Sequence, residues 1–125
     1  MIYDYFVKFS EDLAYLEIVT SHSLTKKKID DYSGIIRGKI YFDRYCLEMI
    51  EVVFLFNNPQ KAKKKYSYHF MDDKNSLIFR YDNAMHHKEI STYPHHKHLK
   101  NEVIKSSEPN IKTILKEIKA YLIKH

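Results

Sequence analysis

The sequence predicts an α+β fold: an antiparallel β-meander of about five to six strands, with an N-terminal and a C-terminal helix packed on the sheet. Three observations lead to this prediction. Apolar residues recur at helical spacing at both ends of the chain, the middle alternates with the period of two typical of strands, and turn residues separate the alternating stretches. Strands grouped between two helices favour this arrangement over repeated βαβ units. The whole chain, 1–125, is expected to form one domain.

The first expected element is a helix over residues 2–18, because its apolar residues follow helical spacing. From about residue 19 the pattern suits a strand. The lysines and aspartates of residues 26–31 suit a solvated turn after that strand.

Residues 34–43 and 46–56 are expected to form two strands joined by a tight turn. The first strand would bury one face if Gly38 takes an inward position, and the second is apolar on both sides. Glu48 and Glu51 of the second strand therefore require a polar face or a partner, and Glu48 is also considered as an additional acid of the site.

A hairpin is expected over residues 64–71 and 76–82, joined by a loop at 72–75. The following segment contains Pro94 and is expected to be rich in loops, with at most a short edge strand around 96–105.

The last expected element is a helix that Ser107 or Asn110 caps. Its apolar stripe comprises Ile111, Ile114, Leu115, Ile118, Tyr121 and Leu122.

The net charge of +5 and the pI near 9.1 allow a polyanionic partner, although a solvated lysine-rich surface explains the charge equally well. The single cysteine excludes an internal disulfide framework and suits a reducing compartment. The N-terminus lacks the features of a signal peptide, and no apolar run is long enough to span a bilayer. We expect a cytoplasmic protein without membrane contact; a homo-oligomer stays open.

Five of the eight histidines lie within residues 86–98. Histidine is a mediocre helix and strand former, but it exchanges protons near neutral pH and binds metals. The cluster is therefore the first place to look for a function.

Alternation on the strand 76–82 places Arg80 and Asp82 on the same side, where they can pair, and His69 shares that side if the hairpin register allows it. A cation, a carboxylate and several histidines suit phosphoryl transfer on RNA, in which one histidine removes a proton, another returns one, and the cation stabilises the transition state. The candidate catalytic residues are His69, Arg80, Asp82, His86, His87, His95, His96 and His98. As a hypothesis, His96 or His98 is the base and His69 or His86 is the acid.

Two alternatives to metal-independent catalysis stay open. No cofactor is expected under the first interpretation, whereas a divalent transition metal such as Zn would make the protein a metal-dependent nuclease or phosphodiesterase. The ligands would then be Asp82, His86, His96 and His98. The other alternative is a nucleic-acid-binding protein without enzymatic activity.

Lysines beside tyrosines are typical of single-stranded nucleic acid binding, although regularly alternating tyrosines also suit a core. The candidate substrate-binding residues are Lys64, Lys65, Tyr66, Tyr68, Asn83 and Lys97.

Much of this pattern resembles the TumE-like toxin family. The matching stretches are residues 66–69, 79–84, 86–87, 89–90 and 93–98, and the start of the C-terminal helix at 106–109 is similar too. The resemblance implies the toxin of a type II toxin–antitoxin pair, with a cognate antitoxin protein as its partner and RNA cleavage or another block on translation as its activity. The residues of the family pattern are His69, Arg80, Asp82, Asn83, His86, His87, Pro94, His95, His96 and His98. Met85 departs from the pattern, since the family usually has proline there.

Overall fold

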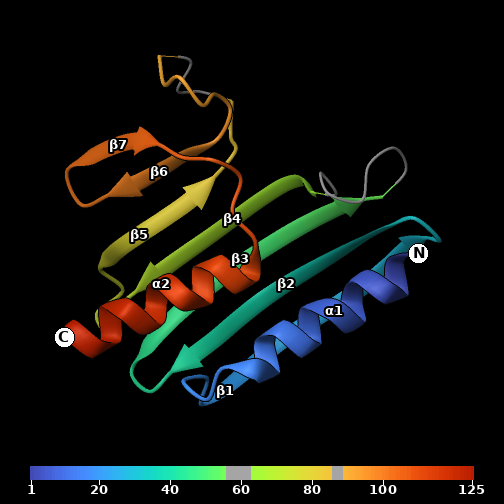
Figure 1. The fold of residues 1–125 in the computed structure, drawn as a ribbon, viewed down its shortest axis with the longest axis horizontal. Helices are drawn as coiled ribbons and strands as arrows, with labels where there is room; N and C mark the ends of the chain where they lie inside the picture. The colour runs from blue at the N-terminus through green and yellow to red at the C-terminus, as the bar shows by residue number, and fades with distance from the viewer. Residues whose placement is uncertain (56–62, 86–88) are drawn as a thin grey trace.

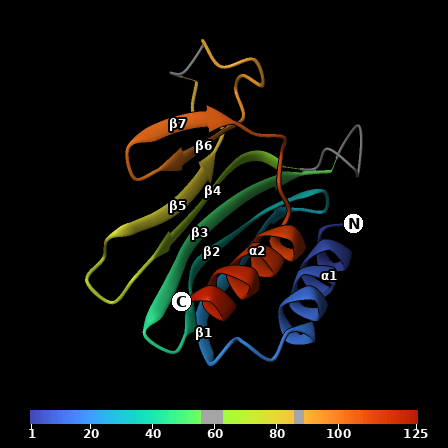
Figure 2. The same cartoon turned by 60° about the vertical axis from the view of Figure 1, so that its left-hand side comes forward.

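An antiparallel sheet forms the centre of the computed structural model, and both helices pack on the same face of it (Figures 1 and 2). The structure describes residues 1–55, 63–85 and 89–125, and the expectations for His86 and His87 lie outside this part. Within it, the helices are α1 (Ile2–Tyr15) and α2 (Ile111–Lys124). The strands are β1 (Ser21–Asp30), β2 (Ser33–Phe42), β3 (Tyr45–Phe54), β4 (Lys63–Met71), β5 (Leu77–Asp82), β6 (His96–Leu99) and β7 (Glu102–Lys105).

The strands follow one another in the sheet in the order of the sequence, from β1 to β7, and each pairs antiparallel with its neighbour. The predicted α+β meander between two helices is therefore confirmed. The described residues contain seven strands because 96–105 forms a hairpin of two short strands instead of at most one.

Two element boundaries differ from the prediction by three residues or more. Helix α1 ends at Tyr15, before the predicted residue 18. Strand β1 continues through the lysines of residues 26–28, which the sequence assigned to a turn. All residues of β1 except Leu24 are exposed. An edge strand tolerates such lysines, because their long side chains reach solvent and discourage pairing with another chain.

Helix α2 begins where the sequence indicates. The Asn110 side chain accepts a hydrogen bond from the Thr113 backbone N–H at 2.9 Å, which satisfies one of the unpaired donors of the first turn.

The core lies between the two helices and the face of the sheet on which they pack. Its strand residues alternate with more exposed ones, as the sequence predicts for β2 and β4. Strand β3 alternates too, which corrects the expectation of a strand buried on both sides, because no helix of the described residues covers the face that carries Glu48 and Ile50. Gly38 occupies an inward position with φ of 143°, and a Cβ atom there would lie 2.0 Å from the Ser23 carbonyl oxygen of β1. Only glycine suits this position, because a side chain would have to push the two strands apart.

Glu51 is buried on the helix-facing side and accepts hydrogen bonds from the hydroxyls of Tyr5 and Tyr68. These hydroxyls are the partners that Glu51 was expected to require in an otherwise apolar strand. Burial, with Glu51 adding to it, raises the pKa of both tyrosines well above 10.

This arrangement predicts a loss of stability at alkaline pH. In the unfolded chain the tyrosines ionise near pH 10, whereas in the folded protein Tyr5 and Tyr68 stay protonated. Stability is therefore complete below pH 10 and falls above it by about 1.4 kcal/mol per pH unit for each such tyrosine. Urea unfolding between pH 8 and 11 measures the slope. Tyr68→Phe should reduce the slope by one proton and the exposed Tyr15→Phe should not; equal slopes in all three proteins would contradict the prediction.

The β4–β5 hairpin carries a bulge between Phe70 and Met71, and its loop is held by Asp72. One carboxylate oxygen of Asp72 accepts hydrogen bonds from the backbone N–H groups of Lys74 and Ser76, both at 2.9 Å. An aspartate that bonds its own loop in this way fixes the turn. The turn and the bulge together set the register between the two strands.

Candidate functional site

The face of the sheet turned away from the helices carries polar side chains, and we call it the open face. In Figure 2 both helices lie on the opposite side. Strand alternation and register place ten residues of interest on the open face. They are Arg37, Lys39, Glu48, Ile50, Ser67, His69, Arg80, Asp82, His96 and His98.

Three functional side chains form a row across adjacent strands. His69 of β4 lies opposite Arg80 of β5, and Arg80 lies opposite His98 of β6. Directly opposite residues of antiparallel strands have Cβ atoms about 4.5–5.5 Å apart. Arg80 therefore leaves the sheet between His69 and His98.

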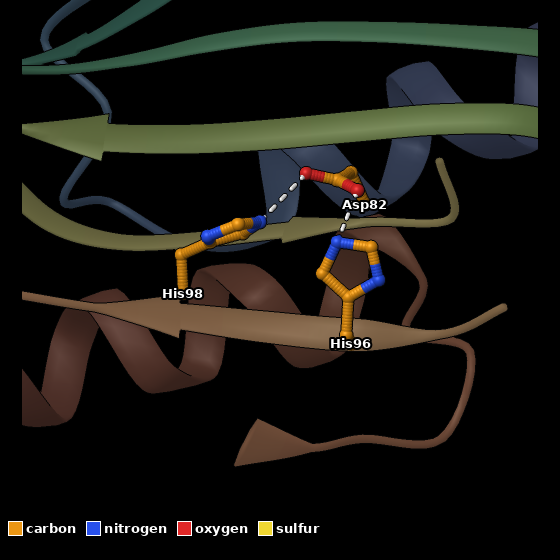
Figure 3. Close-up of side chains that lie close together, drawn as sticks. All are labelled: Asp82, His96 and His98. Atoms are coloured by element: carbon orange, nitrogen blue, oxygen red, sulfur yellow. Dashed lines mark ion pairs between the residues drawn. The ribbon is translucent and has the colours of Figure 1, made fainter. Parts of the chain in front are cut away.

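Asp82 connects this row to a buried histidine (Figure 3). Its carboxylate lies 2.9 Å from Arg80 Nε, 2.7 Å from His96 Nε2 and 3.3 Å from His98 Nε2. Asp82 is 5% exposed and His96 is 1% exposed, so this centre is almost closed to water. The predicted pairing of Arg80 with Asp82 is present.

The neighbouring polar atoms limit which ring nitrogens of His96 and His98 can carry protons. Nδ1 of His96 lies 2.9 Å from the Pro94 carbonyl oxygen, which only accepts, so this nitrogen donates. Nε2 of His98 lies 3.2 Å from Nη2 of Arg80, which can only donate, and 3.3 Å from Oδ2 of Asp82, which can only accept. This nitrogen can therefore accept from Arg80 when the ring is neutral with its hydrogen on Nδ1, or donate to Asp82 when it carries a hydrogen itself.

His69 has a pKa below its ordinary value of 6.5, because burial and the neighbouring Arg80 both disfavour the charged ring; Glu48 opposes them less strongly. His69 is consequently neutral at pH 7. Together with Arg80 it lines a groove on the open face with a volume of about 450 Å³.

Two predicted site residues, His95 just before β6 and Lys97 within it, lie on the side of the sheet that faces the helices. His95 stacks on the ring of Tyr66, and its Nδ1 lies 2.7 Å from the Tyr66 hydroxyl. Lys97 Nζ lies 2.7 Å from Glu117 Oε2 of α2. The histidine cluster is therefore divided between the two faces of the sheet.

The two tyrosines considered for base stacking lie in the core, with Tyr66 1% and Tyr68 0% exposed. Neither ring can receive a base in this structure. Asn83 has a structural contact, since its side-chain oxygen accepts a hydrogen bond from the Tyr66 backbone N–H at 3.0 Å. Lys65 is exposed on the open face. The side chain of Lys64 lies outside the described part, as do His86 and His87.

A metal ion is chemically compatible with part of this site. One ligand atom each of Asp82, His96 and His98 lies within 4.8 Å of the others, and two imidazoles with a carboxylate suit a transition metal. Arg80 works against this use, because it already donates to Asp82 Oδ2 and to His98 Nε2. A dication there would have to displace a cation that holds two of the three ligand groups.

Sequence reasoning missed Arg37 and Lys39, which line the same groove from β2. Both alternate with the buried Ile36 and Ile40, which shows that they face away from the core. What the sequence did not provide was the pairing of β2 through β3 and β4 with β5, and this pairing brings them to Arg80.

The fold and the site define a small α+β protein with a histidine–arginine–carboxylate centre on an open sheet face. The chain belongs to the toxin family TumE: the family model described as "Toxin TumE" matches residues 9–122, almost the whole chain. Membership supports a toxin role and implies a cognate antitoxin as its partner. No curated protein and no solved structure matches the chain significantly. Within the described residues, no helix is long and apolar enough to cross a membrane.

Proposed function

We propose that this toxin cleaves RNA without a metal ion, through proton transfer by His69 and His98 on either side of Arg80. The observation that carries the proposal is the row His69–Arg80–His98 across three neighbouring strands. A phosphodiester bound at the guanidinium would have one imidazole on each side, which suits general acid–base catalysis.

His69 is the base in this proposal. Its lowered pKa keeps the ring neutral at pH 7, and it lines the groove from which a substrate approaches. It takes the proton of the ribose 2′-hydroxyl while the 2′-oxygen forms a bond to phosphorus.

His98 is the acid. When it is protonated, Nε2 can donate to Asp82 Oδ2, 3.3 Å away, and Nδ1 delivers a proton to the 5′-oxygen as the bond from phosphorus to that oxygen breaks. The neutral ring can then accept from Arg80, whose Nη2 lies 3.2 Å from Nε2. A 2′,3′-cyclic phosphate and a 5′-hydroxyl are the products.

His96 and Asp82 act as positioning residues. The sequence suggested His96 or His98 as the base and His69 or His86 as the acid. The burial of His96 keeps it from a substrate, and the low pKa of His69 favours the base role, so we propose the reverse order for the two accessible histidines. Arg80 stabilises the negative charge of the transition state.

The test is RNA cleavage by the purified, untagged protein in the presence of EDTA. We expect cleavage of single-stranded RNA with 2′,3′-cyclic phosphate ends, and growth arrest on induced expression in cells. Cleavage that EDTA abolishes and Zn restores would support instead a metal-dependent nuclease with Asp82, His96 and His98 as ligands, which their short mutual distances favour. Intact RNA after prolonged incubation at several pH values would rule out both mechanisms.

A further inference from the structure

A groove of about 450 Å³ crosses the open face from β2 to β5 and ends at the catalytic row. The residues that matter for its chemistry are Arg37 and Lys39 at one end, Glu48 and Ile50 in the middle, and His69 and Arg80 at the other end.

The groove has an excess of positive charge, with three cations and one carboxylate among these side chains. Lys39 Nζ lies 3.9 Å from Glu48 Oε2, so the single carboxylate among these side chains forms an ion pair with Lys39. Across residues 1–55, 63–85 and 89–125, no carboxylate lies within ion-pair distance of Arg37. An exposed arginine without a neutralising partner is suited to bind a phosphate in a bidentate manner.

The two arginines are placed to contact different phosphates, because Asp82 and His98 hold the Arg80 guanidinium on the side of β5 away from β2. Neighbouring strands lie about 4.8 Å apart, so three steps from β2 to β5 give about 14 Å between the backbones that carry Arg37 and Arg80. A chain with successive phosphodiesters can contact both ends at once. Ile50 lies between them, half-buried, and offers an apolar surface to a ribose or a base.

We infer that the groove binds a single-stranded RNA segment beside the cleaved bond, with Arg37 holding a phosphate one or two nucleotides away from the one at Arg80. The inference rests on the proposed RNA cleavage, because it assigns the substrate of that site. The substrate is accordingly an oligonucleotide, and a dinucleotide leaves the Arg37 end empty. A strand lying flat on an open sheet face requires unpaired nucleotides, as is common for RNA-binding sheets.

The test compares the wild type with Arg37→Gln and with the control Lys119→Gln, which removes the same charge from an exposed position of α2 on the other side of the sheet. The probe is a fluorescein-labelled eight-nucleotide RNA with 2′-O-methyl riboses, which cannot be cleaved because the nucleophile is blocked. Binding is measured by anisotropy at several salt concentrations, and cleavage is measured on an unmodified eight-nucleotide RNA and on a dinucleotide.

Arg37→Gln should weaken binding of the probe roughly tenfold, in line with the loss of one charged hydrogen-bonding group. It should also lower the magnitude of the salt slope by about 0.7, the value for one phosphate contact on a single strand. Lys119→Gln should change neither, and cleavage of the dinucleotide should be the same in all three proteins.

Unchanged probe affinity in Arg37→Gln would overturn the inference while leaving the proposed function intact. Tighter binding to a poly-glutamate peptide than to the RNA would overturn it as well and would assign the groove to an acidic protein segment. Arg37-dependent binding of the probe together with intact natural RNA would leave the groove assignment standing and reject the proposed cleavage.

Discussion

His69→Ala is expected to lower the rate of RNA cleavage by about 10²- to 10⁴-fold, the usual contribution of a general base. The variant should fold, because His69 is only half-buried on a face that no described helix covers. Its affinity for a non-cleavable RNA should change little, since Arg80 keeps its contacts to Asp82 and His98.

The pH dependence of the wild type gives this prediction a second readout. The pKa of His69 is lowered from 6.5, so the neutral base persists below that pH in the folded protein. As the pH falls, kcat/KM should therefore decline only below pH 6.5, and His69→Ala should lack this acidic limb. Rates measured between pH 4.5 and 8 on a short RNA test it.

His22→Ala serves as the matched control, because His22 is an exposed histidine of β1 on the helix-facing side of the sheet. It should keep wild-type activity. A His69→Ala protein that cleaves RNA within threefold of His22→Ala would remove His69 from the mechanism.

Asp82→Ala should cause the largest loss of stability among the site variants, about 3–5 kcal/mol in the free energy of unfolding. The carboxylate is nearly buried and lies within 3.3 Å of side-chain nitrogens of Arg80, His96 and His98. It also accepts a hydrogen bond from the Ala84 backbone N–H at 3.1 Å. Alanine leaves the guanidinium and a buried imidazole without their anion. Urea unfolding at pH 7 measures the change.

Two further variants serve as controls for Asp82→Ala. Asp73→Ala removes an exposed carboxylate from the neighbouring loop and should shift stability by no more than about 0.5 kcal/mol. Asp82→Asn keeps the shape and one acceptor oxygen, so it should lose less than Asp82→Ala. A loss below about 1 kcal/mol in Asp82→Ala would show that the contacts of Asp82 contribute little to stability.

Much of the fold is predictable from local pattern. Alternation identifies the central strands, and Asn110 marks the start of α2, because both signals depend on residues close together in the sequence. The end of α1 and the lysine-rich half of β1 are not predictable in this way. The lysine-rich half of β1 forms a strand because it lies at the edge of the sheet. A run of lysines indicates a turn as long as the pairing with the neighbouring strand is not known.

The sequence predicts those contacts of the site that lie within one strand or within one hairpin. The pairing of Arg80 with Asp82 follows from alternation within β5, and His69 joins them through the adjacent β4. The division of the histidines does not follow from composition. His95 precedes β6 and stacks on a core tyrosine, whereas His96 lies at the start of β6 on the open face.

The hairpin turn at Asp72 makes the chemistry depend on the length of the loop between β4 and β5. The turn and the adjacent bulge align His69 with Arg80. A shift of one residue between β4 and β5 would exchange the two faces of β5 and turn Arg80 and Asp82 toward the helices. A single residue inserted into or deleted from this connection would therefore separate the base from its cation without changing either residue.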